Sequence, residues 1–114
     1  MLADPTIRVV KSYVAHDLVQ LRWAYPDDAT FARALEATAK EVLRARKTPR
    51  TFGRPLAHEL AGWRRSAFPS TPRGEADLRL IFRPREPDGV DVIAFGKRRM
   101  PDTESIYLIV AGRT

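Results

Sequence analysis

Apolar residues change their spacing along this chain near residue 44. Between residues 31 and 43 they recur every three or four positions, which places them on one stripe of a helix. The stripe consists of Phe31, Ala34, Leu35, Thr38, Val42 and Leu43. In residues 78–83 and 90–95 apolar residues alternate instead, the spacing of strands with one buried and one more open face. Helical segments followed by alternating segments predict an α+β domain.

The first part of the chain is expected to form a short strand and two helices. Residues 7–10 are rich in β-branched side chains and predict the strand, and Ser12 is expected to cap a helix that ends near Tyr25. Pro26 disfavours helical geometry in the residue before it, and Asp27 and Asp28 are suited to begin the second helix. Two helices with so short a connection should pack antiparallel as a hairpin against a sheet.

The second part is expected to form strands. Residues 44–55 predict a basic loop, because two prolines and a glycine exclude regular helix and strand. Residues 63–68 predict a strand, and Pro84 ends the alternating strand that starts at Leu78. Residues 105–111 fit either another strand or a short helix. The expected order is β-α-α-β-β-β plus a C-terminal element, with a small, mostly antiparallel sheet packed against the helical hairpin.

The length of 114 residues is that of one domain, and the charge is unevenly distributed. Residues 1–43 hold five Lys and Arg against six Asp and Glu, whereas residues 44–114 hold fifteen against eight. The net charge of +6 therefore comes entirely from the second part, where arginine dominates. Such an imbalance indicates a face that meets a polyanion, with RNA favoured, although a solvated arginine-rich surface is the simpler alternative.

Several classes of protein are excluded by what the sequence lacks. It has no cysteine, so it forms no disulfide or thiolate zinc site, and two histidines are too few to build a metal site alone. We therefore expect no metal and no cofactor. The N-terminal residues lack the order of a secretory signal, and the longest apolar run, residues 106–111, is far shorter than the roughly 20 residues of a membrane span. A cytoplasmic protein without membrane contact is expected.

Four segments in a fixed order resemble the RelE/ParE superfamily of bacterial toxins from type II toxin–antitoxin systems. They are residues 55–65 (PLAHELAGWRR), 77–83 (DLRLIFR), 92–98 (VIAFGKR) and 106–107 (IY). The helical hairpin expected before them occupies the place that the family gives to its own two helices. No single motif is decisive, and the ordered set carries the resemblance.

In the RelE branch, the resemblance implies a metal-free endoribonuclease that cleaves messenger RNA on the ribosome and so inhibits translation. A ribose 2′-hydroxyl would attack the adjacent phosphate, which requires a proton acceptor, a proton donor and positive charge near the phosphorane. The implied partners are mRNA, the ribosome and a cognate antitoxin protein. Operator DNA would be bound only through the antitoxin.

The resemblance also assigns site residues. Arg79 would contact the scissile phosphate, Arg98 would stabilise the transition state, and Tyr107 would orient or deprotonate the 2′-hydroxyl or stack on a base. The wider set expected to bind phosphate is Arg46, Lys47, Arg50, Arg64, Arg65, Lys97 and Arg99. Taken singly, these residues also fit ordinary structural positions. Arg79 fits a solvent-facing strand arginine, Lys97 and Arg98 fit charges in a turn, and Tyr107 fits a core tyrosine.

Two other functions remain open at this stage. One is a ParE-like inhibitor of DNA gyrase without catalysis, which Ala67 favours because the family's cleaving members carry a second basic residue there. The other is a relative that has lost toxicity and binds nucleic acid only through its charge, with an affinity that falls steeply as salt rises.

Overall fold

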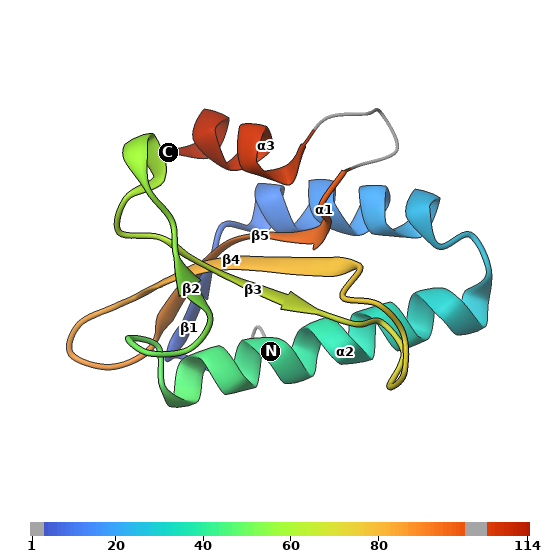
Figure 1. Ribbon diagram of the computed structural model, residues 1–114, viewed down its shortest axis with the longest axis horizontal. Coiled ribbons are helices and arrows are strands. Elements are labelled where there is room, and N and C mark those ends of the chain that lie inside the picture. Colours follow the sequence, from blue (N-terminus) through green and yellow to red (C-terminus); the bar gives the residue numbers. More distant parts are fainter. Residues whose placement is uncertain (1–3, 100–104) are drawn as a thin grey trace.

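A computed structural model describes residues 4–99 and 105–114 of the chain (Figure 1). The elements are β1 (Ile7–Val9), α1 (Lys11–Ala24), α2 (Asp28–Lys47), β2 (Arg54–Pro55), the short 3-10 helix η1 (His58–Leu60), β3 (Arg64–Phe68), β4 (Leu78–Pro84), β5 (Val90–Lys97) and α3 (Ile106–Arg113). The expected α+β class is confirmed, and the C-terminal element is a helix. Among the described residues, no helix has the length and apolar character needed to cross a bilayer.

The five strands form one mixed sheet in the order β1-β5-β4-β3-β2. Neighbouring strands are antiparallel except β1, which runs parallel to β5 and pairs only with its first three residues, 90–92. The expectation of a mostly antiparallel sheet is therefore confirmed, with one parallel edge strand. Beyond residue 92, none of the described strands pairs with the outer side of β5.

Strand β4 separates two apolar clusters because its side chains alternate between the two faces of the sheet. Leu78, Leu80 and Phe82 belong to the larger cluster, which includes Ala34 and Val42 of α2. Ile81 belongs to the second cluster, under α3. The face expected to be more open is thus covered at Ile81, and both Ile81 and Phe82 are fully buried. Between these two pairings the register shifts, because Ile93 of β5 is left without a partner on β4.

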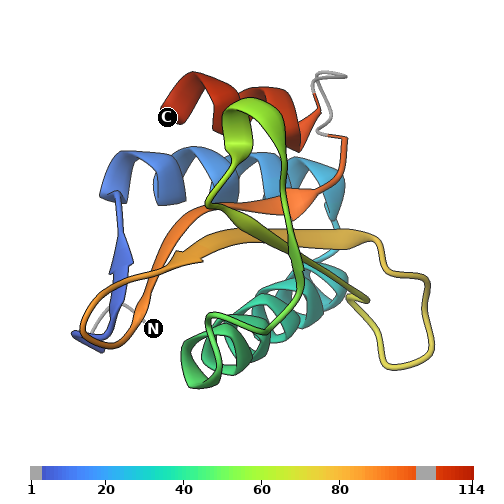
Figure 2. The same ribbon diagram turned by 60° about the vertical axis from the view of Figure 1, so that its left-hand side comes forward.

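The two helices of the expected hairpin diverge instead of packing along each other. Helix α1 lies mainly against β5 and α2 mainly against β4, and the two helices touch each other only slightly. Figure 2 shows α1 and α3 on one side of the strands and α2 on the other. The prediction of two antiparallel helices packed as a pair is therefore wrong in detail, because each helix buries its apolar stripe against the sheet.

The boundaries of α1 and α2 also differ from expectation. Ser12 lies inside α1, whose N-cap is Val10, whereas Asp27 caps α2 as expected by accepting a hydrogen bond from the backbone of Thr30 at 3.1 Å. Helix α2 continues to Lys47 because Ala45 extends its buried stripe. Basic residues in the last turn also suit the negative end of the helix dipole.

Two further expectations for this region are corrected. The basic loop predicted for residues 44–55 is shorter, because its first residues are helical and Arg54–Pro55 form β2. On α2, Leu43 is exposed while Glu41 is buried and accepts a hydrogen bond from Ser66 of β3. A carboxylate can take a core position here because β3 supplies its partner.

Two polar residues of α1 are buried, and one of them closes the free edge of β5. Asp17 accepts a hydrogen bond from the backbone N–H of Phe95 at 3.2 Å and two from the Arg113 guanidinium at 2.8 and 2.9 Å. Arg113 also donates to the carbonyl of Ile93 at 2.8 Å. The two side chains are 1% and 8% exposed, so this buried ion pair joins α1, α3 and β5.

Replacing Arg113 by Met should lower the free energy of unfolding by about 3–5 kcal/mol, because it leaves the buried Asp17 carboxylate without its counter-charge. Urea denaturation measures the loss. The double variant Asp17→Leu/Arg113→Met should recover most of it, since both charges are then absent. A loss below about 1 kcal/mol for Arg113→Met would show that the pair is not the connection described here.

A second polar anchor holds the β3–β4 connection against the end of α1. Asp77 accepts hydrogen bonds from the backbone and hydroxyl of Ser70, at 2.8 and 2.7 Å, and from the hydroxyl of Tyr25. Burial raises the pKa of Asp77, but the hydrogen bonds from Ser70 and Tyr25 outweigh it, so the net pKa is lowered. For Tyr25, burial and the Asp77 carboxylate both raise the pKa of the phenol.

The variant Asp77→Asn should be less stable by about 1 kcal/mol at pH 7, the low end for a hydrogen-bonded carboxylate because the group is partly exposed. Since its folded pKa lies below its unfolded value, the contribution of Asp77 is present above about pH 4 and is lost as the pH falls further. Urea denaturation from pH 7 to pH 2 should therefore show the two proteins converging in acid. A difference that does not change with pH would contradict this assignment.

Candidate functional site

A hollow of about 350 Å³ opens where strands β3 and β4 meet the start of α3. Its lining residues are Leu56, Ala57, Leu60, Arg65, Arg79, Arg98 and Tyr107. Four of these, Arg65, Arg79, Arg98 and Tyr107, are residues that the sequence predicted for the RNA site. They come from four different segments of the chain, and the fold brings them together.

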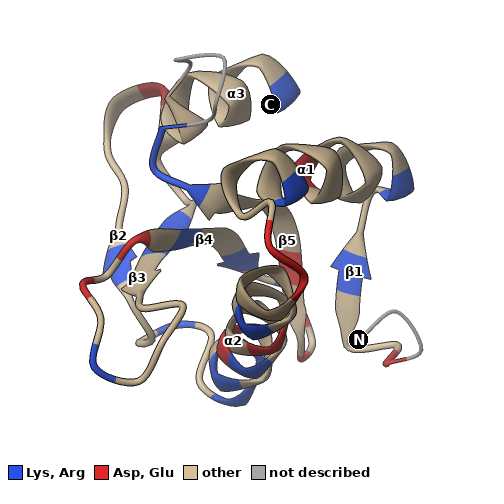
Figure 3. Cartoon of the chain, turned by 90° about the vertical axis from the view of Figure 1, so that its right-hand side faces the viewer, with Lys and Arg blue, Asp and Glu red and all other residues tan. Residues whose placement is uncertain are grey.

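The sheet register places the first two arginines beside each other. Arg65 of β3 pairs with Ile81 of β4, and Arg79 pairs with Ala67, so Arg65 and Arg79 are diagonal neighbours on adjacent strands. Side chains at such positions lie within reach of one another when they are long. Figure 3 shows basic segments of these strands close to the basic stretch that follows β5.

The chain after β5 brings Arg98 and Tyr107 to the same place. The backbone N–H of Ile106 donates to the carbonyl of Arg98 at 2.8 Å, and Arg99 forms an isolated β-bridge with Ser105. The Ser105 hydroxyl then caps α3 by accepting from the backbone of Tyr107 at 3.3 Å. Arg98 and Tyr107 thus lie close together, although residues 100–104, which connect their segments, lie outside the described part of the chain.

The lining of this hollow is basic, and the described residues contribute no acidic side chain to it. Arg79 is half-buried and donates from one terminal nitrogen to the carbonyls of Ala76 and Leu78, at 2.6 and 3.0 Å. Its Nε is buried without a hydrogen-bond partner in the described part of the chain. Within residues 4–99 and 105–114, Arg65 and Arg98 form no ion pair.

This arrangement suits an RNA phosphodiester. Guanidinium groups on two strands and a turn supply charge and donors for a phosphate whose negative charge increases in the transition state. The half-buried Tyr107 supplies a phenol and an aromatic ring at the rim, and Leu56 and Leu60 supply an apolar surface for a base or ribose.

A larger hollow of about 570 Å³ lies between α2 and the β3–β4 connection, but its charges are mixed. Its lining includes Arg33, Lys40 and Arg44, but also Glu36 and Glu41. Lys40 pairs with Glu36 at 3.0 Å, and Arg44 with Glu41 at 3.4 Å. Paired charges attract a polyanion less than unpaired ones, so size alone does not identify this hollow as the site.

The remaining residues expected to bind phosphate lie outside the smaller hollow. Arg64 donates to the carbonyls of Phe52 and Gly53 at 2.8 and 3.2 Å, which orients it away from Arg65. Lys97 lies over the ring of Tyr25 at 4.9 Å, and Arg99 is in the bridge with Ser105.

The three basic residues expected in the loop after residue 44 are also dispersed. Arg46 pairs with Asp4 at 3.4 Å, Arg50 pairs with Glu86, and Lys47 ends α2. None of the three lines the hollow. Arg46 and Arg50 therefore have carboxylate partners from distant segments, which the charge of the neighbouring sequence does not indicate.

The apolar lining was not anticipated from the sequence. Leu56, Ala57 and Leu60 belong to the segment around η1, and Leu60 packs with Ile106 and Val110 of α3 in the second cluster. The sequence feature that could have identified them is their position between Pro55 and Arg65, inside the first segment that carries the resemblance. Their contact with α3 depends on the tertiary fold.

The described residues contain no group of three His, Cys, Asp or Glu side chains that could hold a metal ion. Comparisons with protein-family models, with curated proteins and with solved structures found no match for this chain.

Replacing Arg79 or Arg98 by Gln should weaken binding of a single-stranded RNA oligonucleotide and reduce the salt dependence of that binding. The slope of log K against log salt should decrease by about 0.7 for each phosphate that the variant no longer neutralises. Fluorescence anisotropy at several salt concentrations measures this slope. The control is Arg73→Gln, which removes an exposed charge in the β3–β4 connection; an equal effect of the control would show that total charge, not the hollow, governs binding.

Proposed function

We propose that this chain is the toxin of a type II toxin–antitoxin pair, a RelE-like, metal-free endoribonuclease that cleaves messenger RNA on the ribosome and so inhibits translation. One observation carries the proposal. Arg65, Arg79, Arg98 and Tyr107, which the resemblance assigned to the RNA site, line one hollow to which the described part of the chain contributes no acidic side chain.

In the proposed reaction, the ribose 2′-oxygen attacks the adjacent phosphorus and the bond to the 5′-oxygen of the next nucleotide breaks. The products are a 2′,3′-cyclic phosphate and a free 5′-hydroxyl, and the proton lost by the 2′-hydroxyl balances the one gained by the leaving oxygen. Arg79 and Arg65 hold the phosphate, and Arg98 stabilises the phosphorane. Tyr107 orients the 2′-hydroxyl or stacks on the neighbouring base.

The order of elements supports the same proposal. A strand and two helices precede four consecutive antiparallel strands, β2 to β5, so the two helices take the place that the resemblance gives to the family's own two helices. The basic hollow also suits the proposed partner, an antitoxin with an acidic or amphipathic segment that covers it. Contact with operator DNA would then occur only through that antitoxin.

Gyrase inhibition remains the second candidate, because Ala67 is the residue paired with Arg79 on β3. A second cation at that position would face the same strand pair, and the alanine supplies none. The missing cation is an argument against catalysis, but the three arginines that line the hollow are still present.

The test is inducible expression in a bacterial host, followed by mapping of new 5′ ends in messages soon after induction. We expect cuts within translated codons and an early arrest of growth. Arg98→Ala should abolish both, and Tyr107→Phe, which keeps the ring and removes the hydroxyl, should slow cleavage by about 10²-fold if the phenol moves a proton.

Arg73→Ala is the matched control, because it removes an exposed arginine outside the hollow and should leave cleavage intact. Growth arrest with intact messages and DNA damage signalling would replace the proposal by gyrase inhibition. Normal growth without any antitoxin would replace it by simple binding of nucleic acid.

A further inference from the structure

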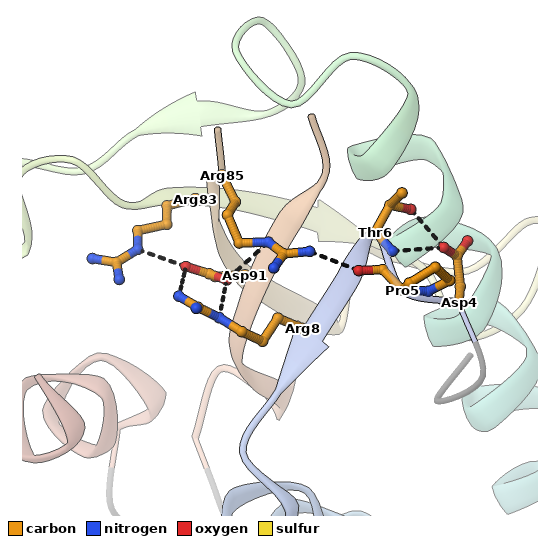
Figure 4. Close-up of polar contacts among 7 residues, drawn as sticks. All are labelled: Asp4, Pro5, Thr6, Arg8, Arg83, Arg85 and Asp91. Carbon is orange, nitrogen blue, oxygen red and sulfur yellow. Dashed lines mark hydrogen bonds and ion pairs between the residues drawn. The ribbon is translucent and has the colours of Figure 1, made fainter. Parts of the chain in front are cut away.

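Three arginines surround a single carboxylate at the opposite end of β4. Asp91 of β5, which is nearly buried, accepts two hydrogen bonds from Arg8 of β1, at 2.7 and 2.8 Å, and one from Arg83 of β4, at 3.1 Å. The Nε of Arg85 lies 3.7 Å from the same carboxylate (Figure 4). Three positive groups share one negative group, so the cluster keeps a surplus of positive charge.

The three arginines differ in how many of their donors bind groups of the protein itself. Arg8 holds Asp91 in a bidentate pair, and Arg85 also donates to the carbonyl of Pro5 at 2.7 Å. Arg83 uses only its Nε, and within the described residues its two terminal nitrogens have no hydrogen-bond partner. Figure 4 shows that end of Arg83 pointing away from Asp91.

Arg83 is oriented from a second side by an aromatic ring. Its guanidinium lies 4.4 Å from the ring centre of Trp63, a half-buried residue just before β3. Asp91 and Trp63 together hold the guanidinium plane, which lowers the entropy lost when its free nitrogens bind a ligand. Arg83 is therefore a prearranged donor pair beside an aromatic surface.

These residues border a second hollow, of about 380 Å³, next to the C-terminal end of α3. Its lining includes Arg8, Arg83, Trp63 and Tyr13. Arg113 also contributes, but its charge is neutralised by the buried Asp17. Asp91 lines the hollow too, and Arg8 and Arg83 share its single negative charge, so positive charge remains in excess there. The hollow thus combines this excess of guanidinium charge with aromatic walls, the pairing by which proteins hold a phosphate and its base in single-stranded nucleic acid.

We propose that this second hollow binds one nucleotide of a single-stranded RNA, with the phosphate on Arg83 and Arg8 and the base against the stack of Trp63 and Arg83. The inference deepens the proposed function and rests on it for the identity of the strand. It adds a binding site that is separate from the cleavage residues and shares none of their side chains.

The position of the second hollow fits one strand crossing both sites. Arg79 and Arg83 are four residues apart on β4, about 13 Å at the usual rise of a strand. The two hollows lie at the two ends of α3, with Tyr107 at one and Arg113 at the other. An RNA that reaches both sites is held at two phosphates, which sets its register relative to the scissile bond.

Trp63 provides a local signal for the test. The chain has two tryptophans, and Trp23 is exposed, so Trp23→Phe leaves Trp63 as the single fluorophore. In this background, a 2′-O-methyl oligoribonucleotide, which cannot be cleaved, should quench Trp63 in a saturable way. Arg83→Gln should weaken this binding by about tenfold, the effect of removing one charge-assisted hydrogen bond, whereas Arg73→Gln should leave it nearly unchanged.

A second pair of variants separates the effect of how the arginines are oriented from the effect of the net charge of the protein. Asp91→Asn and Asp88→Asn each raise the net charge by one, but Asp88 is exposed in the β4–β5 turn and Asp91 orients the arginines. Asp91→Asn should weaken quenching although the protein becomes more basic, and Asp88→Asn should not. Thermal melting checks that both variants remain folded at the temperature of the titration.

Three results would overturn the inference: no change in Trp63 fluorescence, equal losses of affinity for Arg83→Gln and Arg73→Gln, or tighter binding of poly-glutamate than of the oligonucleotide. Binding of adenosine monophosphate as tight as that of the oligonucleotide would assign the hollow to free nucleotides instead of a strand. Saturable quenching of Trp63 in a protein that has all its cleavage residues but cuts no message would refute the proposed function alone. Cleavage with unchanged binding in Arg83→Gln would refute this inference alone.

Discussion

The buried pair of Asp17 and Arg113 connects parts of the chain that no strand pairing joins. One carboxylate satisfies the free backbone N–H of Phe95 at the edge of β5 and neutralises a guanidinium from the last turn of α3. An exposed strand edge is otherwise open to pairing with another chain, and a helix is one way to cover it. Because this pair fixes α3 across the sheet, it also determines where the two hollows lie.

The charge surplus of the chain has two different roles in the fold. Arg8, Arg46, Arg50 and Arg113 have carboxylate partners, and these pairs connect separate segments. Arg65, Arg79 and Arg98 instead meet in a hollow to which the described residues add no acidic side chain. Composition gives only the total charge and does not show which arginines pair with carboxylates. That difference distinguishes the hollow around Arg79, a candidate RNA site, from pairs such as Arg46 with Asp4 that connect segments of the fold.

Some elements were predictable because local signals agreed with the fold. Asp27 and Pro84 mark real boundaries, and the alternation of Leu78, Leu80 and Phe82 identifies the face that packs on α2. Other predictions were wrong where distant partners changed the result. Asp17, Gln20 and Glu41 are polar positions in a helical repeat, yet they are buried, because β5, α3 and β3 supply hydrogen-bond partners for Asp17 and Glu41. Among the described residues, the side-chain oxygen of Gln20 has no hydrogen-bond partner, and nothing in the structure explains its burial.

By itself the sequence determined the α+β class, the basic character of the second part and the residue types available for phosphate chemistry, since these follow from periodicity and composition. The resemblance pointed to Arg79, Arg98 and Tyr107 as candidates. Only the folded chain shows which arginines pair with a carboxylate among the described residues, that residues 106–113 form a helix, and that a separate group gathers around Asp91. Whether an arginine pairs with a carboxylate depends on which distant segment the fold places beside it. The spacing of residues along the chain does not specify that segment.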